Sequence, residues 1–302
     1  MAYDGRIMQR ALARFDEDKQ RRGAQLEQRR RTAYARAPRL AEIDTELRGT
    51  MSRIISSALA RGTDPLPAIR VLRDENLQLQ RERVQLLASL GYPADWLEEK
   101  PACAQCGDTG YVQGGVCPCL RAYYAREQLA ELSRLLPLGE DSFETFSFDW
   151  YDSTVQPAFG VSPRENMERN FDVCRDYAYQ FDRGGGNLLL SGGTGLGKTF
   201  LSACIARVVS ENGFSVVYDT AASVFSRFED AKFRRDDGGS EDADRCMKCD
   251  LLILDDLGTE FVTPYFITVF YSLLNNRLGA GLPTIITTNI TDGALLEKRY
   301  TE

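Results

Sequence analysis

The N-terminal part of the chain carries apolar side chains at helical spacing among many charged ones. Residues 4–36 hold no proline, residues 40–60 repeat apolar side chains three or four positions apart, and residues 68–90 carry a modest apolar stripe. Such spacing lines one face of a helix. We therefore predict three helices, the second ended by residues 61–65, that pack as a small bundle or dock onto a partner protein.

The second half alternates short apolar runs with helix-like segments. Runs with the character of buried strands lie at 188–190, 216–218, 251–254 and 284–287, and helix-like segments lie at 163–181 and 200–209. Strands that alternate with helices predict an α/β fold with a parallel sheet.

A glycine-rich stretch follows the first of these strands and matches the pattern G-x-x-x-x-G-K-[ST]. Backbone N–H groups of such a loop close around an anion, and the positive end of the next helix faces it. Lys198 would reach the β- and γ-phosphates, and the Thr199 hydroxyl suits Mg²⁺. The predicted site for ATP or GTP consists of Gly192, Gly193, Thr194, Gly195, Leu196, Gly197, Lys198 and Thr199.

Polar residues follow two later strands, where a parallel sheet binds ligands. Asp255 and Asp256 end the run 251–254, and Asn289 follows the run 284–287. We expect Asp255 to hold Mg²⁺ with Thr199, Asp256 to orient or deprotonate the attacking water, and Asn289 to contact the γ-phosphate. These three are the candidate catalytic residues.

Four of the eight cysteines lie close together, as Cys103-x-x-Cys106 and Cys117-x-Cys119. Four thiolates on two glycine-containing turns suit tetrahedral Zn²⁺ in a structural role. The short Cys-x-Cys arm departs from the usual spacing, so an iron–sulfur cluster and unligated thiols are the alternatives. The separate pair Cys246-x-x-Cys249 has no second pair beside it, and we predict no metal there.

Charge and composition limit the classes of function. The net charge of −7 divides unevenly: residues 1–100 hold 19 Lys and Arg against 15 Asp and Glu, and the remainder is acidic. Composition alone therefore does not indicate binding to duplex nucleic acid. The chain has no histidine, so its chemistry must use carboxylates, thiols, Lys and Arg. No apolar run suits a membrane span or signal peptide, and we expect a cytoplasmic protein with no membrane partner.

These motifs together resemble the bacterial replicative helicase loaders of the DnaC/DnaI type, which are AAA+ ATPases related to IstB-like transposition helpers. The resemblance rests on residues 192–199, 249–258, 282–289 and 103–120. The cysteine segment discriminates between the two groups, because the transposition helpers generally lack it. The resemblance implies an ATP-controlled replication protein that binds a hexameric replicative helicase, delivers it to single-stranded DNA and associates with itself. The alternatives are a transposase-associated AAA+ regulator and a zinc-containing adaptor whose nucleotide site serves only as a switch.

The resemblance also implies a domain plan: residues 1–100 bind the helicase, 101–135 form the Cys₄ zinc module, 136–162 form an aromatic connector packed on the ATPase domain, and 163–302 form the AAA+ domain. The family's sheet order is 5-1-4-3-2, and the four runs above supply strands 1 to 4. Strand 5, the arginine finger and the helical lid are expected to be missing, and Arg299 does not match the finger position. We therefore expect a C-terminally truncated chain that hydrolyses ATP poorly and leaves strand 1 at the sheet edge.

Overall fold

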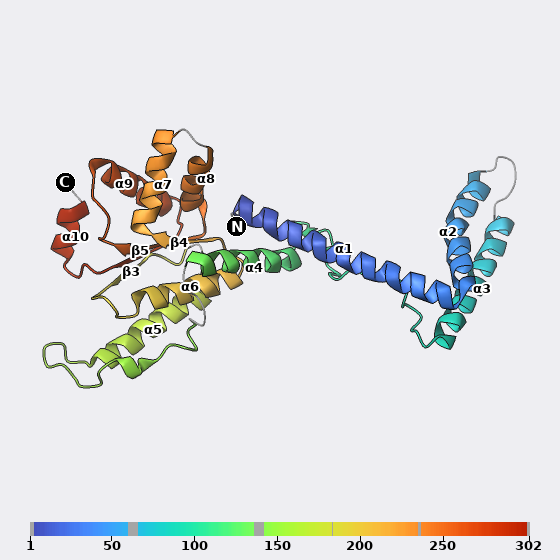
Figure 1. Cartoon of the computed structure of the whole chain (residues 1–302), viewed down its shortest axis with the longest axis horizontal. Helices are drawn as coiled ribbons and strands as arrows, with labels where there is room; N and C mark the ends of the chain where they lie inside the picture. The colour runs from blue at the N-terminus through green and yellow to red at the C-terminus, as the bar shows by residue number, and fades with distance from the viewer. Residues whose placement is uncertain (1–2, 60–65, 136–141, 183, 235–236, 301–302) are drawn as a thin grey trace. The chain divides into compact units, whose positions relative to one another are not determined.

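A computed structural model describes residues 3–59, 66–135, 142–182, 184–234 and 237–300. The chain divides into two compact units, one of residues 15–109 and one that combines residues 1–14 with 110–302. Figure 1 labels the helices of both units and some of the strands. The helix end predicted at 61–65 lies outside the described residues.

The unit of residues 15–109 is helical, as predicted. Its helices are the greater part of α1 (Gly5–Arg36), α2 (Pro38–Leu59) and α3 (Leu66–Ser89). Arg83 of α3 pairs with Asp44 of α2 at 2.7 Å, and both side chains are largely buried. Leu40 and Leu87 add fully buried apolar contacts beside this pair. The apolar stripes of α2 and α3 therefore pack against each other.

The other unit is built on a parallel sheet of four strands in the described residues. The strands are β3 (Leu188–Ser191), β4 (Val216–Thr220), β5 (Leu251–Leu257) and β6 (Thr284–Thr288). Their order is β3-β6-β5-β4, which is the predicted order 1-4-3-2. The predicted α/β fold is confirmed, and β3, the predicted strand 1, lies at one edge with Leu189 56% exposed.

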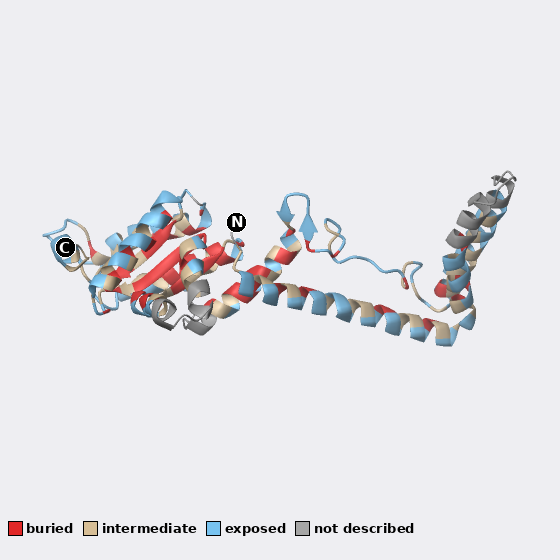
Figure 2. Cartoon of the chain, turned by 90° about the horizontal axis from the view of Figure 1, so that it is seen from above, coloured by how far each residue is buried: buried red, intermediate tan, exposed pale blue. Residues whose placement is uncertain are grey.

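Helices cover both faces of this sheet, as the buried strands between them in Figure 2 show. Around one face lie α4 (Pro118–Leu135), α5 (Pro163–Tyr179) and α6 (Lys198–Glu211). On the other lie α7 (Ala221–Arg234), α8 (Asp237–Lys248) and α9 (Pro264–Gly279), and α10 (Gly293–Tyr300) follows β6. Alternate residues of β5 enter the two cores: Ile253 lies in the first, and Leu252 and Leu254 lie in the second.

The segment before α5 packs on the same unit through its aromatic side chains. Phe148–Trp150 forms one turn of 3-10 helix. The ring of Phe146 lies 5.3 Å from that of Phe200 on α6 and 5.1 Å from that of Phe171 on α5. The predicted packing of this aromatic segment against the domain that follows it is therefore present.

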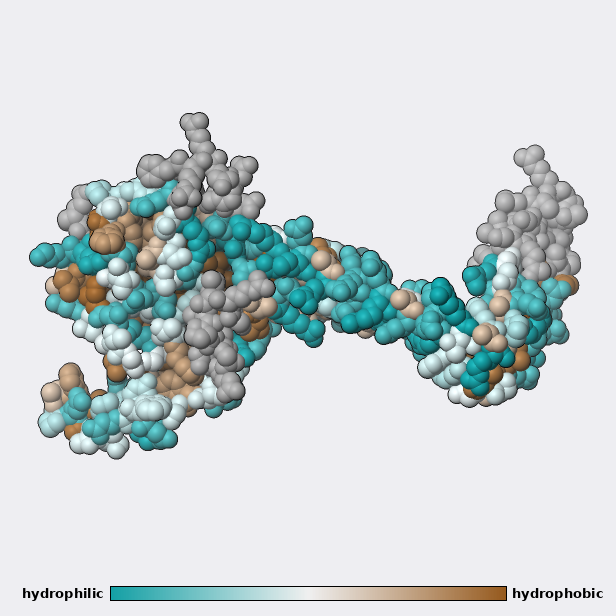
Figure 3. All heavy atoms as spheres, viewed as in Figure 1, coloured by the Kyte–Doolittle hydropathy of each residue, from teal (hydrophilic) through white to brown (hydrophobic). Residues whose placement is uncertain are grey.

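The start of α1 also belongs to the unit that contains the sheet. Arg10 pairs with Glu131 of α4, and Arg245 of α8 pairs with Asp4 and, at 2.8 Å, with Glu131. Ile7 is buried among these groups. Charged and polar residues dominate α1 in Figure 3, as its sequence predicts. No described helix combines the length and the apolar character that a membrane crossing requires.

A fully buried arginine connects elements at the amino ends of the strands. Arg277 of α9 donates hydrogen bonds to Cys246 O, Cys249 O, Pro283 O and Thr284 Oγ1 at 2.6 to 3.0 Å. Two of these carbonyls lie at the C-terminal end of α8, where the helix dipole favours a positive charge. Arg277 thus joins α8, α9 and the start of β6.

Candidate functional site

The predicted phosphate loop connects β3 to α6 at the carboxyl edge of the sheet. Gly197 precedes α6 with φ 83° and makes no side-chain capping bond. This left-handed backbone conformation favours glycine, and a Cβ on Gly197 would displace the Tyr151 hydroxyl, which would lie 2.9 Å from it. The N–H groups at this helix end are suited to an anion.

Lys198 folds back over the loop and reaches the end of β6. Its Nζ donates to Gly192 O at 2.9 Å, to Gly193 O at 2.8 Å and to Asn289 Oδ1 at 2.8 Å. Asn289 Nδ2 in turn donates to Asp256 Oδ1 at 2.9 Å. Three residues proposed from separate motifs are therefore joined in one hydrogen-bonded chain.

Thr199 and Asp255, the two predicted Mg²⁺ ligands, are also neighbours. Thr199 Oγ1 lies 3.2 Å from Asp255 Oδ2, and Asp255 is 7% exposed. Its carboxylate also accepts hydrogen bonds from the hydroxyls of Tyr218, at 2.9 Å, and Thr287. Burial, followed by the charge of Asp255, raises the pKa of Tyr218, so Tyr218 remains a protonated donor.

The donor set at Asp255 fits a hard divalent cation. Within the described residues no Lys or Arg forms an ion pair with this carboxylate, and a buried charge with only neutral partners is costly. Carboxylate and hydroxyl oxygens are the ligands that Mg²⁺ prefers. Thr199 and Asp255 could therefore hold Mg²⁺, which would neutralise phosphate charge.

Asp256 has an unusual backbone conformation that brings its side chain to the site. Its φ is 56°, in the left-handed region that few non-glycine residues adopt. The register between β5 and β6 shifts between Leu254 and Leu257, and the Asp256 N–H donates to Thr287 Oγ1 at 2.9 Å. This bulge directs Asp256 to Asn289, and such strain is commonly found at functional sites.

Sequence reasoning missed three residues at this site. Tyr218 and Thr287 hold Asp255 from the two strands that flank β5, and Tyr151 donates to Leu196 O in the loop at 3.2 Å. Tyr and Thr are common in strands, so neither Tyr218 nor Thr287 carries a sequence signal of its own, and only the strand register places them beside Asp255. The local sequence around Tyr151 contains no signal either.

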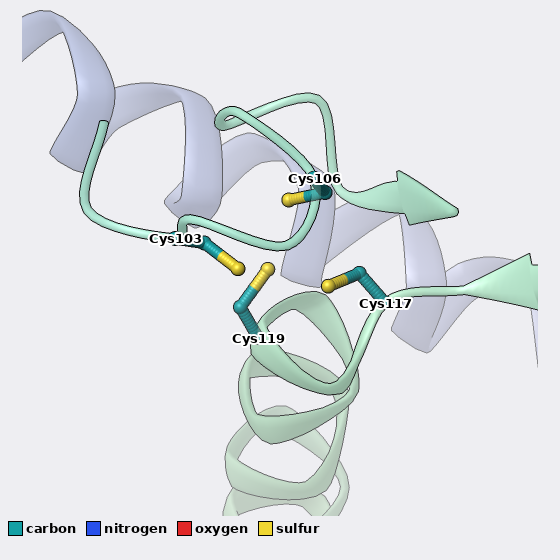
Figure 4. A group of neighbouring side chains, drawn as sticks. All are labelled: Cys103, Cys106, Cys117 and Cys119. Atoms are coloured by element: carbon teal, nitrogen blue, oxygen red, sulfur yellow. The ribbon is translucent and has the colours of Figure 1, made fainter. Parts of the chain in front are cut away.

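The four clustered cysteines come together as the sequence predicts. The Sγ atoms of Cys103, Cys106, Cys117 and Cys119 all lie within 4.8 Å of one another, and in Figure 4 they point toward a common centre. Two strands, β1 (Tyr111–Val112) and β2 (Gly115–Val116), form the hairpin between the cysteine pairs. Four soft thiolates in this arrangement could hold a metal, and tetrahedral Zn²⁺ fits them.

Asp108, which the sequence did not single out, supports the first cysteine turn. Its carboxylate accepts the N–H groups of Ala102, at 3.0 Å, and Cys103, at 2.9 Å, and pairs with Arg22 at 2.9 Å. Burial opposes the charged form, but these N–H bonds and Arg22 outweigh it and hold the pKa of Asp108 below its usual value. Such bonds orient a metal-binding turn.

Comparison with known proteins places the nucleotide motifs in one family domain. The family of IstB-like ATP-binding proteins matches residues 174–295, and this range contains all the predicted nucleotide-site residues. No protein with a curated description matches the chain.

Several solved structures are similar over about half of the chain. The DnaC helicase loader is 20% identical, with 52% of this chain and 88% of that chain covered and a TM-score of 0.42. DnaI is 29% identical, with 45% and 72% covered and a TM-score of 0.38. A primosome component from Streptococcus pyogenes serotype M3 is 28% identical, with 44% and 68% covered and a TM-score of 0.37.

The family match coincides with the part of the chain in which the loop, the acidic pair and Asn289 meet. ATP binding is the property that the family's description names. Residues 174–295 are therefore similar to IstB-like ATP-binding proteins, and the predicted resemblance to this family is confirmed over that range.

Proposed function

We propose that the chain is an ATP-controlled helicase loader, which binds a hexameric replicative helicase and delivers it to single-stranded DNA. Its helical N-terminal region would bind the helicase, and its ATP-binding domain would couple nucleotide state to DNA contact and self-association. The cytoplasmic location expected from the sequence remains part of this proposal.

The observation that carries the proposal is the joining of the cysteine segment to the ATP-binding domain. Helix α4 begins between Cys117 and Cys119 and continues into the core of that domain. There Gln128 Nε2 donates to Ser210 Oγ at 2.9 Å and to Phe214 O at 2.7 Å, and Gln128 Oε1 accepts Val216 N at 3.1 Å. The transposition helpers generally lack the cysteine segment, so this construction favours a loader.

We assign ATP, Mg²⁺ and Zn²⁺ as cofactors from the donor groups present. Lys198 would exchange its bonds to loop carbonyls for the β- and γ-phosphates, and Thr199 and Asp255 would hold Mg²⁺, which stabilises phosphate charge. Asp256 would orient or deprotonate the attacking water, and Asn289 would position the γ-phosphate. Zn²⁺ at the cysteine cluster would be structural.

We further propose that hydrolysis by this chain alone is slow. The Arg299 guanidinium donates to Glu260 O at 2.8 Å and lies over the ring of Tyr300. Arg299 is therefore held by its own chain and does not act as an arginine finger. An arginine supplied in trans commonly contributes about 10³- to 10⁵-fold in rate.

Capture of the helicase tests the proposed function. The tagged full-length chain is mixed with purified replicative helicase from the same organism, with ATP and Mg²⁺ or with EDTA. We expect helicase capture that changes with nucleotide and falls in the Cys103→Ser/Cys106→Ser variant, while Cys174→Ala, a buried cysteine outside the cluster, serves as the matched control.

The same experiment separates the alternatives. Capture of a transposase in place of the helicase would support the transposase-associated regulator, which the IstB-like family match also permits. Capture of the helicase to the same extent with ATP and with EDTA would support the adaptor. Failure to capture the helicase under either condition contradicts the loader.

A further inference from the structure

Asp255 is held from behind by two buried hydroxyl groups. Tyr218, 3% exposed on β4, donates to Oδ2, and Thr287, 1% exposed on β6, donates to Oδ1. Thr199 is exposed, and its Oγ1 approaches the same carboxylate from the loop side. Each carboxylate oxygen therefore has one buried donor, and the pair restricts rotation of the carboxylate plane.

The two hydroxyls also connect Asp255 to the rest of the site. Tyr218 Oη lies 3.1 Å from Ser202 Oγ on α6, the helix that follows the predicted phosphate loop. Thr287 Oγ1 accepts the N–H of Asp256 at 2.9 Å while it donates to Asp255. Thr287 therefore orients both Asp255 and Asp256. Tyr218 connects Asp255 to α6, the helix that carries Thr199.

We propose that Tyr218 and Thr287 are positioning residues that hold Asp255 in the orientation in which its carboxylate and the Thr199 hydroxyl bind Mg²⁺. The inference rests on the proposed nucleotide site and deepens it. Loss of either hydroxyl removes one charge-assisted bond and frees the carboxylate to turn from the cation. Nucleotide contacts that do not involve Mg²⁺ remain.

The test compares the Mg²⁺ requirement of hydroxyl-deleted variants of the full chain. Fluorescent ATP is titrated in EDTA and at a series of Mg²⁺ concentrations, and the Mg²⁺ concentration that gives half of the affinity gain is recorded. For Tyr218→Phe and Thr287→Val we expect this midpoint to rise about tenfold, the size expected for one lost bond to a charged group. Affinity in EDTA should change less than about twofold, because the missing bond acts through Asp255.

Matched controls lie in the same domain. Thr288→Val removes a buried hydroxyl from the adjacent position of β6, where it donates to Leu257 O, and Tyr177→Phe removes a hydroxyl that donates to Gly186 O at 3.1 Å. Neither contacts Asp255, so both should keep the wild-type Mg²⁺ midpoint. Thr287→Ser keeps the hydroxyl and should restore the midpoint, which guards against misfolding of Thr287→Val.

The outcomes distinguish this inference from the proposed function. An unaltered Mg²⁺ midpoint in folded Tyr218→Phe, or a shift of the same size in Tyr177→Phe, overturns the positioning role while ATP binding stands. Absence of nucleotide binding by the unaltered chain rejects the nucleotide site and the positioning role together. A raised midpoint that Thr287→Ser restores supports the inference.

Discussion

The two ends of the parallel sheet both gather polar side chains but hold them differently. At the amino end, Arg277 is fully buried and donates to carbonyl and hydroxyl oxygens, and fully buried Asp250 accepts from Ser215. At the carboxyl end, Lys198 is half-buried and Asn289 is exposed, and they bond to each other.

This difference separates polar groups that stabilise the fold from polar groups that are able to bind a ligand. A buried group whose partners all belong to the protein cannot change them without leaving a polar atom unsatisfied. An exposed group can exchange its partner for water or a ligand at little cost. We therefore interpret the amino end as structural and the carboxyl end as the ligand site.

The largest expected effect is the loss of the buried arginine. Arg277→Met leaves several buried acceptors without a donor, and we expect it to lower the free energy of unfolding by about 3 kcal/mol or more. Denaturant unfolding measures this. The control Arg169→Met breaks an exposed pair with Glu165 on α5 and should cost less than about 1 kcal/mol. An equal loss of unfolding free energy in Arg277→Met and Arg169→Met would contradict the structural role of the amino end of the sheet.

Loss of Lys198 should have the reverse effect, with a large change in ATP affinity and a small change in the free energy of unfolding. Lys198→Ala removes the cation that would contact phosphate, and we expect ATP affinity to fall roughly tenfold to a hundredfold. The free energy of unfolding should change little, because Lys198 is not fully buried. Fluorescent-nucleotide titration beside denaturant unfolding measures both quantities, with exposed Lys248→Ala as the control. A large loss of stability with unchanged affinity would assign Lys198 to structure.

A smaller effect on binding is expected at the second acid. Asp256→Asn keeps an oxygen for Asn289 to donate to, so ATP affinity should remain within about twofold, while phosphate release should fall because the variant cannot accept a proton from water. Measurement of both quantities on one preparation provides the check. Unimpaired hydrolysis would remove Asp256 from the catalytic role.

The smallest effect is expected for the thiols near Arg277. Burial raises the pKa of Cys246 to about 12, and burial likewise raises the pKa of Cys249. Because the thiolate is the reactive form, both should react negligibly with a thiol reagent at pH 8, with or without a chelator. The clustered cysteines should react only after metal removal, and mass spectrometry of the labelled peptides identifies the sites. Labelling of Cys246 in the folded chain would contradict the interpretation that the amino end of the sheet is closed to solvent.

The sequence predicts the strands and the place of the site, because these depend on local signals, and the order of the strands follows from the family resemblance. Apolar runs mark the strands, and glycines mark the loop. The carboxyl ends of parallel strands meet at one edge, which brings Asp255 and Asn289 near Lys198. The clustered cysteines have a similarly local signal in their spacing.

The remaining features depend on contacts between residues distant in sequence. Arg277 lies on a helix where an arginine is usually exposed, and only packing of α8 and β6 around it reveals its burial. Tyr218 and Thr287 are typical strand residues until the register places them beside Asp255. The positive φ of Asp256 arises from a β-bulge that no pattern of residues in the sequence predicts.

The most direct test of the account is the stabilisation of the unaltered chain by ATP. A ligand that binds only the folded protein raises the free energy of unfolding by about 2.7 kcal/mol at a concentration one hundred times its Kd. We predict this increase for the full chain with ATP and Mg²⁺, and a much smaller one for Lys198→Ala at the same ATP concentration. The same stabilisation in both proteins, or none in the unaltered chain, would contradict a ligand site at the carboxyl end of the sheet.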